Sequence, residues 1–127
     1  MKTKPINAPD APSTPGTYAQ AMAVTDVSEW LVISGQIGAD VDGQVPESFD
    51  AQAKLIWSNI DAQLRAAGMS RDNLIKVTIY LSDRKYIDGY RAARDAYLDG
   101  RQVALTCIIA GIFDEGWLME IEALAGR

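Results

Sequence analysis

Leu74 to Leu81 has the sequence LIKVTIYL, in which apolar and polar side chains alternate from Ile75 onward. A period of two is typical of a β-strand that buries one face in the core. Residues 84–98, which follow at once, change to spacings of three and four, and this indicates an amphipathic helix. Asp83 can cap its start, and Gly100 lies just beyond its end. The buried face of this helix is formed by Ile87, Tyr90, Ala93 or Arg94, and Tyr97.

A longer helix is predicted upstream of that strand, over residues 50–67. Ser48 or Asp50 can accept its first free backbone N–H groups, and Gly68 ends it. Its apolar face consists of Ala53, Ile56, Ile60 and Leu64, with Leu55 and Trp57 at the margin. Further strands are predicted at residues 17–24, 29–37, 104–112 and 117–124.

The strand within residues 105–112, LTCIIAGI, is apolar on both faces. A strand of this kind is covered on both sides. Two helices can cover one side of the sheet, so we expect another copy of the chain to cover the other. An exposed face of mixed polarity is the alternative.

The 127 residues suit one domain, which we place at residues 16–127. Residues 1–15 hold four of the five prolines and are predicted to form an irregular lead-in. No apolar run approaches the roughly 20 residues that cross a bilayer, and the N-terminus lacks the apolar stretch of a signal peptide. We therefore expect a cytoplasmic protein with no membrane partner.

Composition excludes several kinds of chemistry. The chain has no histidine, which removes Ser-His and Cys-His nucleophile systems and most zinc or copper sites. Its one cysteine cannot form an intrachain disulfide. The net charge is −5, and the densest basic group, Arg84, Lys85, Arg91 and Arg94, alternates with Asp83, Asp88 and Asp95. Because nucleic acids are bound through clustered Lys and Arg, this pattern disfavours a nucleic-acid partner.

Five segments together resemble the RidA/YjgF family, in the same order and at matching spacing across residues 16–125. They are Gly16–Ala21 (GTYAQA), Ile33–Ile37 (ISGQI), Ala51–Gly68, Ile75–Asp83 (IKVTIYLSD) and Glu120–Ala123 (EIEA). The resemblance implies an α+β, chorismate-mutase-like (YjgF) fold, a mixed sheet with two helices packed on one face. It also implies a homotrimer whose sheets form a central barrel, with small-molecule clefts between subunits. Whether such a trimer pairs into a hexamer is left open.

In active family members the cleft hydrolyses 2-imino or enamine acids to 2-oxo acids and ammonia, with no cofactor and no metal. An arginine binds the substrate carboxylate, because a planar guanidinium fits it in a bidentate manner. A backbone group of the S-G-Q strand holds the nitrogen, and a carboxylate places the water.

Three residues of this sequence match the family's cleft. Glu120 falls at the position of the water-placing carboxylate, although it also fits an exposed strand carboxylate beside Glu122. Tyr18 matches a cleft tyrosine and equally suits a packing role. Gly35 suits a close approach of backbone to ligand, or a β-bulge.

The family's carboxylate-binding arginine has no direct counterpart, because Leu105 occupies its position. Arg101 lies four residues upstream and is a poor substitute. Arg91 stands where many active members carry a cleft asparagine, and it can reach an anionic ligand from the opposite wall. It can equally be a surface residue paired with Asp88 or Asp95, and this second interpretation is favoured.

Thr106 and Cys107 follow Leu105 at the predicted mouth of the cleft. A thiolate needs a cationic neighbour and no histidine is present, so a small buried apolar role is favoured for Cys107. Trp117 fits an aromatic wall for a ligand or a packing residue at the rim.

These residues leave three interpretations of function. The first is a divergent Rid-type hydrolase of imines, enamines or related small nitrogen compounds, with weak or absent activity on standard 2-imino acids because of Leu105. The second is a non-catalytic trimer that binds a small metabolite or a partner in the same clefts. The third is an endoribonuclease or translation inhibitor, which the acidic charge and the absence of histidine disfavour.

Overall fold

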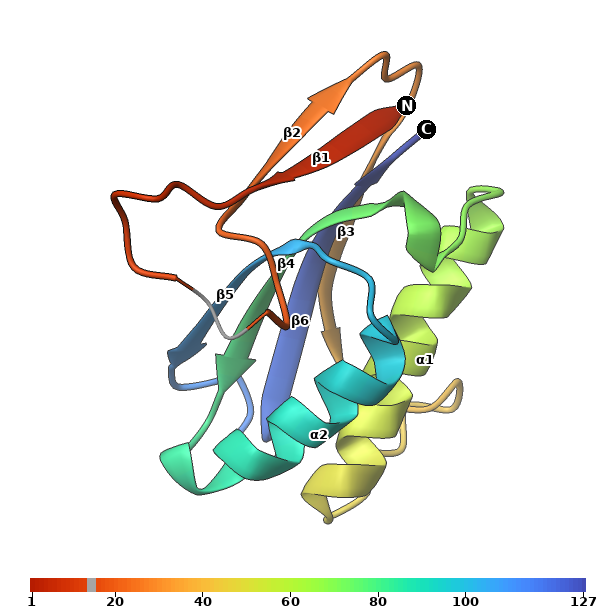
Figure 1. Cartoon of the computed structure of the whole chain (residues 1–127). Helices are drawn as coiled ribbons and strands as arrows, with labels where there is room; N and C mark the ends of the chain where they lie inside the picture. Colours follow the sequence, from red (N-terminus) through yellow and green to blue (C-terminus); the bar gives the residue numbers. More distant parts are fainter. Residues whose placement is uncertain (14–15) are drawn as a thin grey trace.

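The computed structural model describes residues 1–13 and 16–127, and its helices and main sheet form two layers (Figure 1). The sheet contains β3 (Trp30–Ile37), β6 (Met119–Gly126), β4 (Leu74–Leu81) and β5 (Ala104–Ile109), in that order. β4 runs parallel to β5 and antiparallel to β6, which is also antiparallel to β3. The helices are α1 (Phe49–Ala66) and α2 (Ile87–Leu98), with short 3-10 turns at η1 (Arg71–Asn73) and η2 (Arg84–Tyr86).

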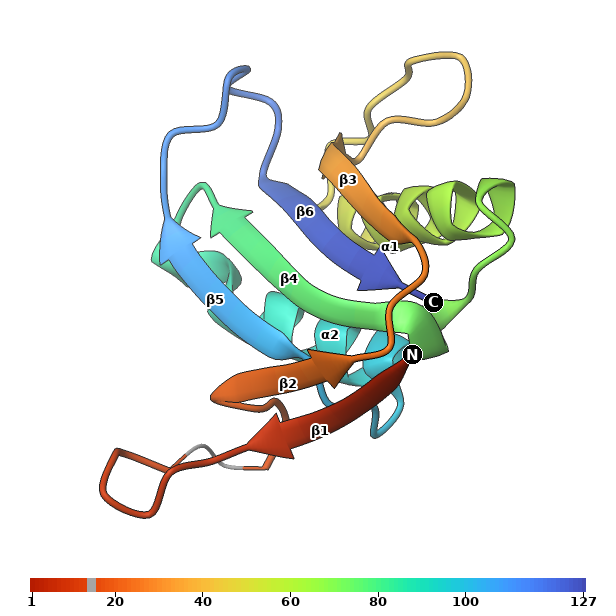
Figure 2. The same cartoon turned by 90° about the horizontal axis from the view of Figure 1, so that it is seen from above.

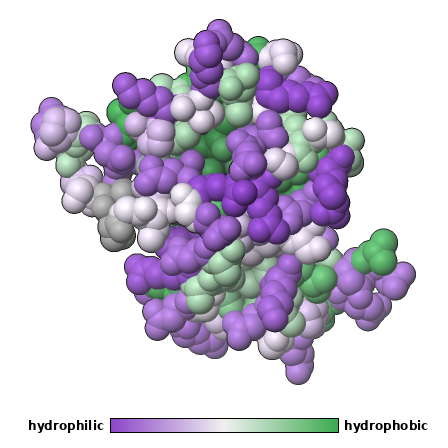
Figure 3. All heavy atoms as spheres, turned by 45° about the vertical axis from the view of Figure 1, so that its right-hand side comes forward, coloured by the Kyte–Doolittle hydropathy of each residue, from purple (hydrophilic) through white to green (hydrophobic). Residues whose placement is uncertain are grey.

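Both helices lie on the same face of the sheet (Figure 2). The predicted α+β class, the mixed sheet and the placement of two helices on one face are therefore confirmed. On the outer side of the helical layer hydrophilic atoms dominate, and paler hydrophobic atoms gather over its lower half (Figure 3).

Local sequence explains where α1 begins and ends. The Ser48 hydroxyl accepts a hydrogen bond from the Ala51 N–H at 3.2 Å, which satisfies one free donor of the first turn. Gly68, with φ +68°, adopts the left-handed conformation that ends the helix. These bounds differ from the predicted helix by one residue at each end.

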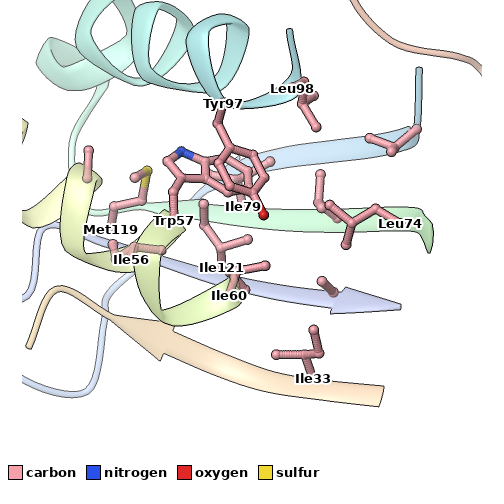
Figure 4. Close-up of a cluster of buried hydrophobic side chains, with 14 of the residues drawn as sticks. Ile33, Ile56, Trp57, Ile60, Leu74, Ile79, Tyr97, Leu98, Met119 and Ile121 are labelled. Atoms are coloured by element: carbon pink, nitrogen blue, oxygen red, sulfur yellow. The ribbon is translucent and has the colours of Figure 1, made fainter. Parts of the chain in front are cut away.

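The core lies between the helices and the sheet (Figure 4). Ile56 and Ile60 of α1 are fully buried against Ile79 and Ile121 of the central strands. The rings of Trp57 and Tyr97 stack with their centroids 4.1 Å apart, which fastens α1 to α2.

The prediction of an irregular lead-in is wrong for Lys2–Ile6. This segment is a strand, β1, paired antiparallel with β2 (Ala21–Thr25) in a separate two-stranded sheet. Pro5 has no N–H to donate, but a strand at the edge of a sheet tolerates that loss. Residues 14 and 15, which belong to the predicted lead-in, lie outside the described residues.

The strand predicted at residues 17–24 begins only at Ala21. Before it, the chain bends through Thr17 and Tyr18 and meets the start of β5. There the Ala19 N–H donates to the Val103 carbonyl at 2.9 Å. This contact brings Thr17 and Tyr18 to the edge of the main sheet, beside α2.

The face of the sheet away from the helices is open within the described part of the chain. It carries the polar side chains of Thr78 and Tyr80, but also Trp30, Val32 and Ile108, which are 53%, 78% and 46% exposed. β5 thus has apolar side chains on both faces, as its sequence predicted. That another copy of the chain covers the open face stays a prediction.

Candidate functional site

A pocket of about 630 Å³ opens between α2 and the edge strand β5. We call it the α2–β5 pocket. Its floor is apolar, and its helical wall is rich in arginine. It is lined by Thr17, Tyr18, Arg84, Ile87, Tyr90, Arg91, Arg94, Asp95, Leu105, Cys107 and Ile109.

Arg94 is the polar centre of this pocket and is only 6% exposed. Its Nε donates to Asp95 at 2.9 Å, Nη1 to the Tyr90 hydroxyl at 3.1 Å, and Nη2 to the Thr17 hydroxyl at 3.4 Å. Burial acts to lower the pKa of Arg94, but the bonds to Asp95 and Tyr90 outweigh it and the pKa is raised. The pocket therefore contains a charged guanidinium held in one orientation.

Four of the residues singled out from the sequence line this pocket together: Tyr18, Arg91, Leu105 and Cys107. Arg91 is exposed and forms no ion pair in the described part of the chain. Asp95, one of its two expected surface partners, binds Arg94 instead. The favoured surface pairing of Arg91 is thus not seen in the structure.

Cys107 is half-buried beside the Tyr90 hydroxyl. Burial raises the pKa of its thiol, and a hydrogen bond with Tyr90 and the charges of Arg94 and Arg91 offset this only in part. The thiol therefore stays protonated near neutral pH, which does not suit a nucleophile. Its packing beside the core agrees with the favoured apolar role.

Glu120 and Gly35 lie elsewhere, on the open face of the sheet. Glu120 is paired with Tyr80 across the β4–β6 ladder, and Tyr80 donates a hydrogen bond to Glu122 at 3.0 Å. The Glu120 side chain lies directly over Gly35, since a Cβ added there would overlap its Oε1 and lie 2.9 Å from its Cδ. The β3–β6 register also shifts between Ile33 and Gln36, so Gly35 sits in an irregular part of the strand.

Thr106 and Trp117 also lie outside the α2–β5 pocket. Thr106 is exposed on the open face, opposite Thr78 in the β4–β5 ladder. Trp117 is in the loop before β6, with its ring 6.1 Å from that of Phe113. Gln52 holds this loop to α1, because it donates to the Gly116 carbonyl and accepts from the Leu118 N–H, each at 2.9 Å.

The predicted site is therefore divided between two faces of the sheet within one chain. Tyr18, Arg91, Leu105 and Cys107 are on the helical side, whereas Glu120 is on the open side. Among the described residues, no cluster of three or more His, Cys, Asp and Glu side chains is placed to hold a metal ion. Within the same residues, no helix is both long and apolar enough to cross a membrane.

Comparisons with known proteins agree with the fold in pointing to one family. Residues 8–126 match the family model described as Endoribonuclease L-PSP. The chain belongs to the Rid (RidA/YjgF) family. It is 35% identical to a RutC family protein of Aquifex aeolicus, with 92% of each chain covered. It is 32% identical to the 2-iminobutanoate/2-iminopropanoate deaminase of Mus musculus, over 96% of this chain and 90% of the relative.

Among solved structures, the chain resembles the Rid-family protein YyfB of Yersinia pestis, a protein of unknown function. The TM-score is 0.87, with both chains covered completely and 23% sequence identity. At this identity the likeness shows the shared fold alone.

Sequence reasoning assigned no site role to the other lining residues, and Arg94 is the most consequential of them. Arg94 was placed on the buried face of its helix only as an alternative to Ala93, and no function was assigned to it. The signal was present, because an arginine four residues after Tyr90 and three before Tyr97 lies on an apolar face. A buried arginine needs polar partners, which Asp95 and Tyr90 supply.

Proposed function

We propose that the protein is a Rid-type hydrolase of imines, enamines or related small nitrogen compounds, acting in clefts between the subunits of a homotrimer. The observation that carries the proposal is the α2–β5 pocket, in which Arg94 presents a buried guanidinium above an apolar floor. A small anionic molecule with an apolar body fits such a site.

The reaction needs water, a carboxylate and an oriented substrate. Water adds to the carbon of the C=N bond while Glu120 holds it and accepts a proton. The tetrahedral adduct then expels ammonia and leaves a carbonyl group. The guanidinium wall binds the anionic end of the substrate, which fixes the position of the C=N carbon.

Two subunits are required because the groups of the site lie on opposite faces of the sheet in one chain. A second copy packed on the open face would bury Trp30, Val32 and Ile108. It would also set the Glu120 of one copy beside the pocket of another. In a closed ring of three copies, every open face is covered by a neighbouring copy in the same way.

We expect standard 2-imino acids to be poor substrates. The side chain at the β5 wall is Leu105, which cannot bind a carboxylate, so the anion must be held from α2 instead. A lost charge-assisted hydrogen bond weakens binding by about 1.5–3 kcal/mol. A short 2-imino acid held from the wrong wall also misplaces its reacting carbon.

The test is a dehydratase-coupled assay that follows the loss of 2-iminobutanoate and 2-iminopropanoate, with an arginine-bearing family member as positive control. We expect weak turnover by this protein, and a gain in kcat/KM of about tenfold or more in Leu105→Arg. Leu105→Met is the matched control, since it keeps the apolar volume without the charge. A rate equal to the positive control, unchanged in Leu105→Arg, would contradict the role given to Leu105.

Leu105 also favours a second candidate function, a trimer that binds a small metabolite without turning it over. The two candidates differ in one measurement, the effect of Glu120→Gln. In a hydrolase this variant retains ligand binding and loses turnover. If no imine is hydrolysed faster than in buffer while a ligand still binds the pocket, the binding role holds.

A further inference from the structure

The α2–β5 pocket carries more positive charge than a single carboxylate requires. Of the described residues that line it, Arg84, Arg91 and Arg94 are cationic and Asp95 is anionic, which leaves an excess of two positive charges. This excess stands out in a chain with a net charge of −5. Asp95 is already bonded to Arg94. In the part of the chain that the structure describes, no carboxylate pairs with Arg84 or Arg91.

The three guanidinium groups differ in how firmly the structure holds them in place. Arg94 is buried and bonded to Asp95, Tyr90 and Thr17, so its position is fixed. Arg91 precedes it by three residues on α2, and side chains at that spacing start about 5–6 Å apart on one helix face. Arg84 lies on η2, just before α2, and both it and Arg91 are exposed. The pocket thus has one rigid and two adjustable cationic groups.

We infer that the ligand of this pocket is a small dianion, a dicarboxylate whose imine is the substrate and whose ketone is the product. Arg94 and Arg91 bind one carboxylate, and Arg84 binds the second. The apolar floor of Leu105 and Ile109 contacts the carbon chain between them. The reaction is the one proposed above, in which water replaces the nitrogen of C=N by oxygen and releases ammonia. Naming the substrate rests on the proposed function, whereas binding of the dianion does not.

A nucleic acid is a poorer match for the same arginines. A phosphate backbone is bound by exposed cations along a surface, whereas Arg94 is 6% exposed inside a pocket. The acidic chain around the pocket also repels a long polyanion, but a small dianion inside the pocket meets the local excess of positive charge.

The experiment compares two ligands of equal length, 2-oxoglutarate and 2-oxopentanoate, which differ in one terminal carboxylate. Calorimetric titration of the full-length protein at low ionic strength should give a Kd at least about tenfold lower for 2-oxoglutarate. The ratio should fall in high salt. In Arg84→Gln it should fall towards one. Lys85→Gln, an adjacent exposed cation outside the pocket, should leave it unchanged.

Turnover is measured on the matching imines, 2-iminoglutarate and 2-iminopentanoate, generated by oxidation of glutamate and norvaline. A preference for 2-iminoglutarate that Arg84→Gln abolishes supports both proposals. Arginine-dependent binding of 2-oxoglutarate without turnover of either imine supports the dianion site and contradicts the hydrolase.

Equal Kd values for the two ligands would overturn the inference even if both imines are hydrolysed. So would arginine-dependent binding of a short single-stranded RNA that 2-oxoglutarate does not displace. Two further variants, Arg94→Met and Arg91→Gln, should weaken binding of 2-oxoglutarate. If Arg94→Met fails to fold, the test rests on Arg84→Gln and Arg91→Gln, because both of these arginine side chains are exposed.

Discussion

The side chain of Glu120 occupies the space that any side chain at position 35 would need. A Cβ on Gly35 would overlap the Glu120 carboxylate, which is the flexible end of its side chain. Gly35→Ala should therefore move the carboxylate without a large loss of stability. The glycine of the ISGQI strand serves to seat the acid that we propose to place water.

We expect Gly35→Ala to lower kcat by about 100-fold, the order of effect that a displacement of about 1 Å can have on a catalytic group. The melting temperature should change little. The measurement is steady-state turnover of the better imine substrate, beside thermal unfolding. Gly111→Ala is the control, because a Cβ there meets nothing within 4 Å. An active Gly35→Ala protein would show that the position of Glu120 does not matter.

At this scale the sequence located part of the candidate site. Motif matching at fixed spacing singled out Tyr18, Arg91, Leu105 and Cys107. In the structure these four residues line one pocket. Arg94 was missed, since helical periodicity indicates which face is buried but not which buried polar side chain lines a pocket.

Three elements are joined by the network of Asp61, Arg71 and Tyr97, from α1, η1 and α2. Arg71 Nη2 donates to Asp61 at 2.6 Å, and the Tyr97 hydroxyl donates to it at 2.7 Å. The Arg71 guanidinium also lies over the Tyr97 ring, 4.1 Å from its centroid. The network braces the helical layer against the start of β4.

This network predicts a loss of stability in acid. Burial raises the pKa of Asp61, but the bonds from Arg71 and Tyr97 outweigh it, and the pKa lies below its ordinary value of 3.8. A lowered pKa in the folded state gives stability above the unfolded pKa that is lost as the pH falls through the folded one. Chemical unfolding should therefore show a steeper loss below about pH 4 in the wild type than in Asp61→Asn.

Asp88→Asn is the control for that measurement, since Asp88 is exposed and forms no ion pair within the described residues. Its stability should follow the wild-type pH dependence. Parallel curves for wild type and Asp61→Asn would mean that the network contributes nothing to acid sensitivity.

The bounds of helices and strands whose apolar residues recur at a clear spacing were predicted within a few residues. Elements without such a spacing were not predicted. β4 has the predicted bounds, Leu74–Leu81. β1 was missed because all five of its residues are exposed, so Lys2–Ile6 shows no alternation of apolar and polar side chains. Its pairing with β2 depends on a partner distant in sequence, which local pattern cannot reveal.

At the scale of the whole molecule, we expect copies of the chain to assemble through the open face of the sheet. Val32, on the edge strand β3, is 78% exposed on this face in the single chain, near polar groups such as Thr78 and Glu122. If a second copy covers this face, a charge placed there is buried at a cost of several kcal/mol.

We expect the wild type to elute as a trimer in size-exclusion chromatography with light scattering, and Val32→Asp to shift it towards monomer at micromolar concentration. Val41→Asp is the matched control, because Val41 is fully exposed in the loop before α1. A monomeric wild type, or a trimer that tolerates Val32→Asp, would contradict burial of this face.

The central claim is that one site is built from two copies, with Glu120 from one and the α2–β5 pocket from another. It is tested most directly by unfolding and refolding an equal mixture of Glu120→Ala and Arg94→Met chains, each of which we expect to be inactive alone as a homo-oligomer. Random assembly of a ring places an intact Glu120 beside an intact pocket at about a quarter of the sites. We predict recovery of about a quarter of the wild-type turnover, whereas no recovery from correctly assembled mixtures would contradict a shared site.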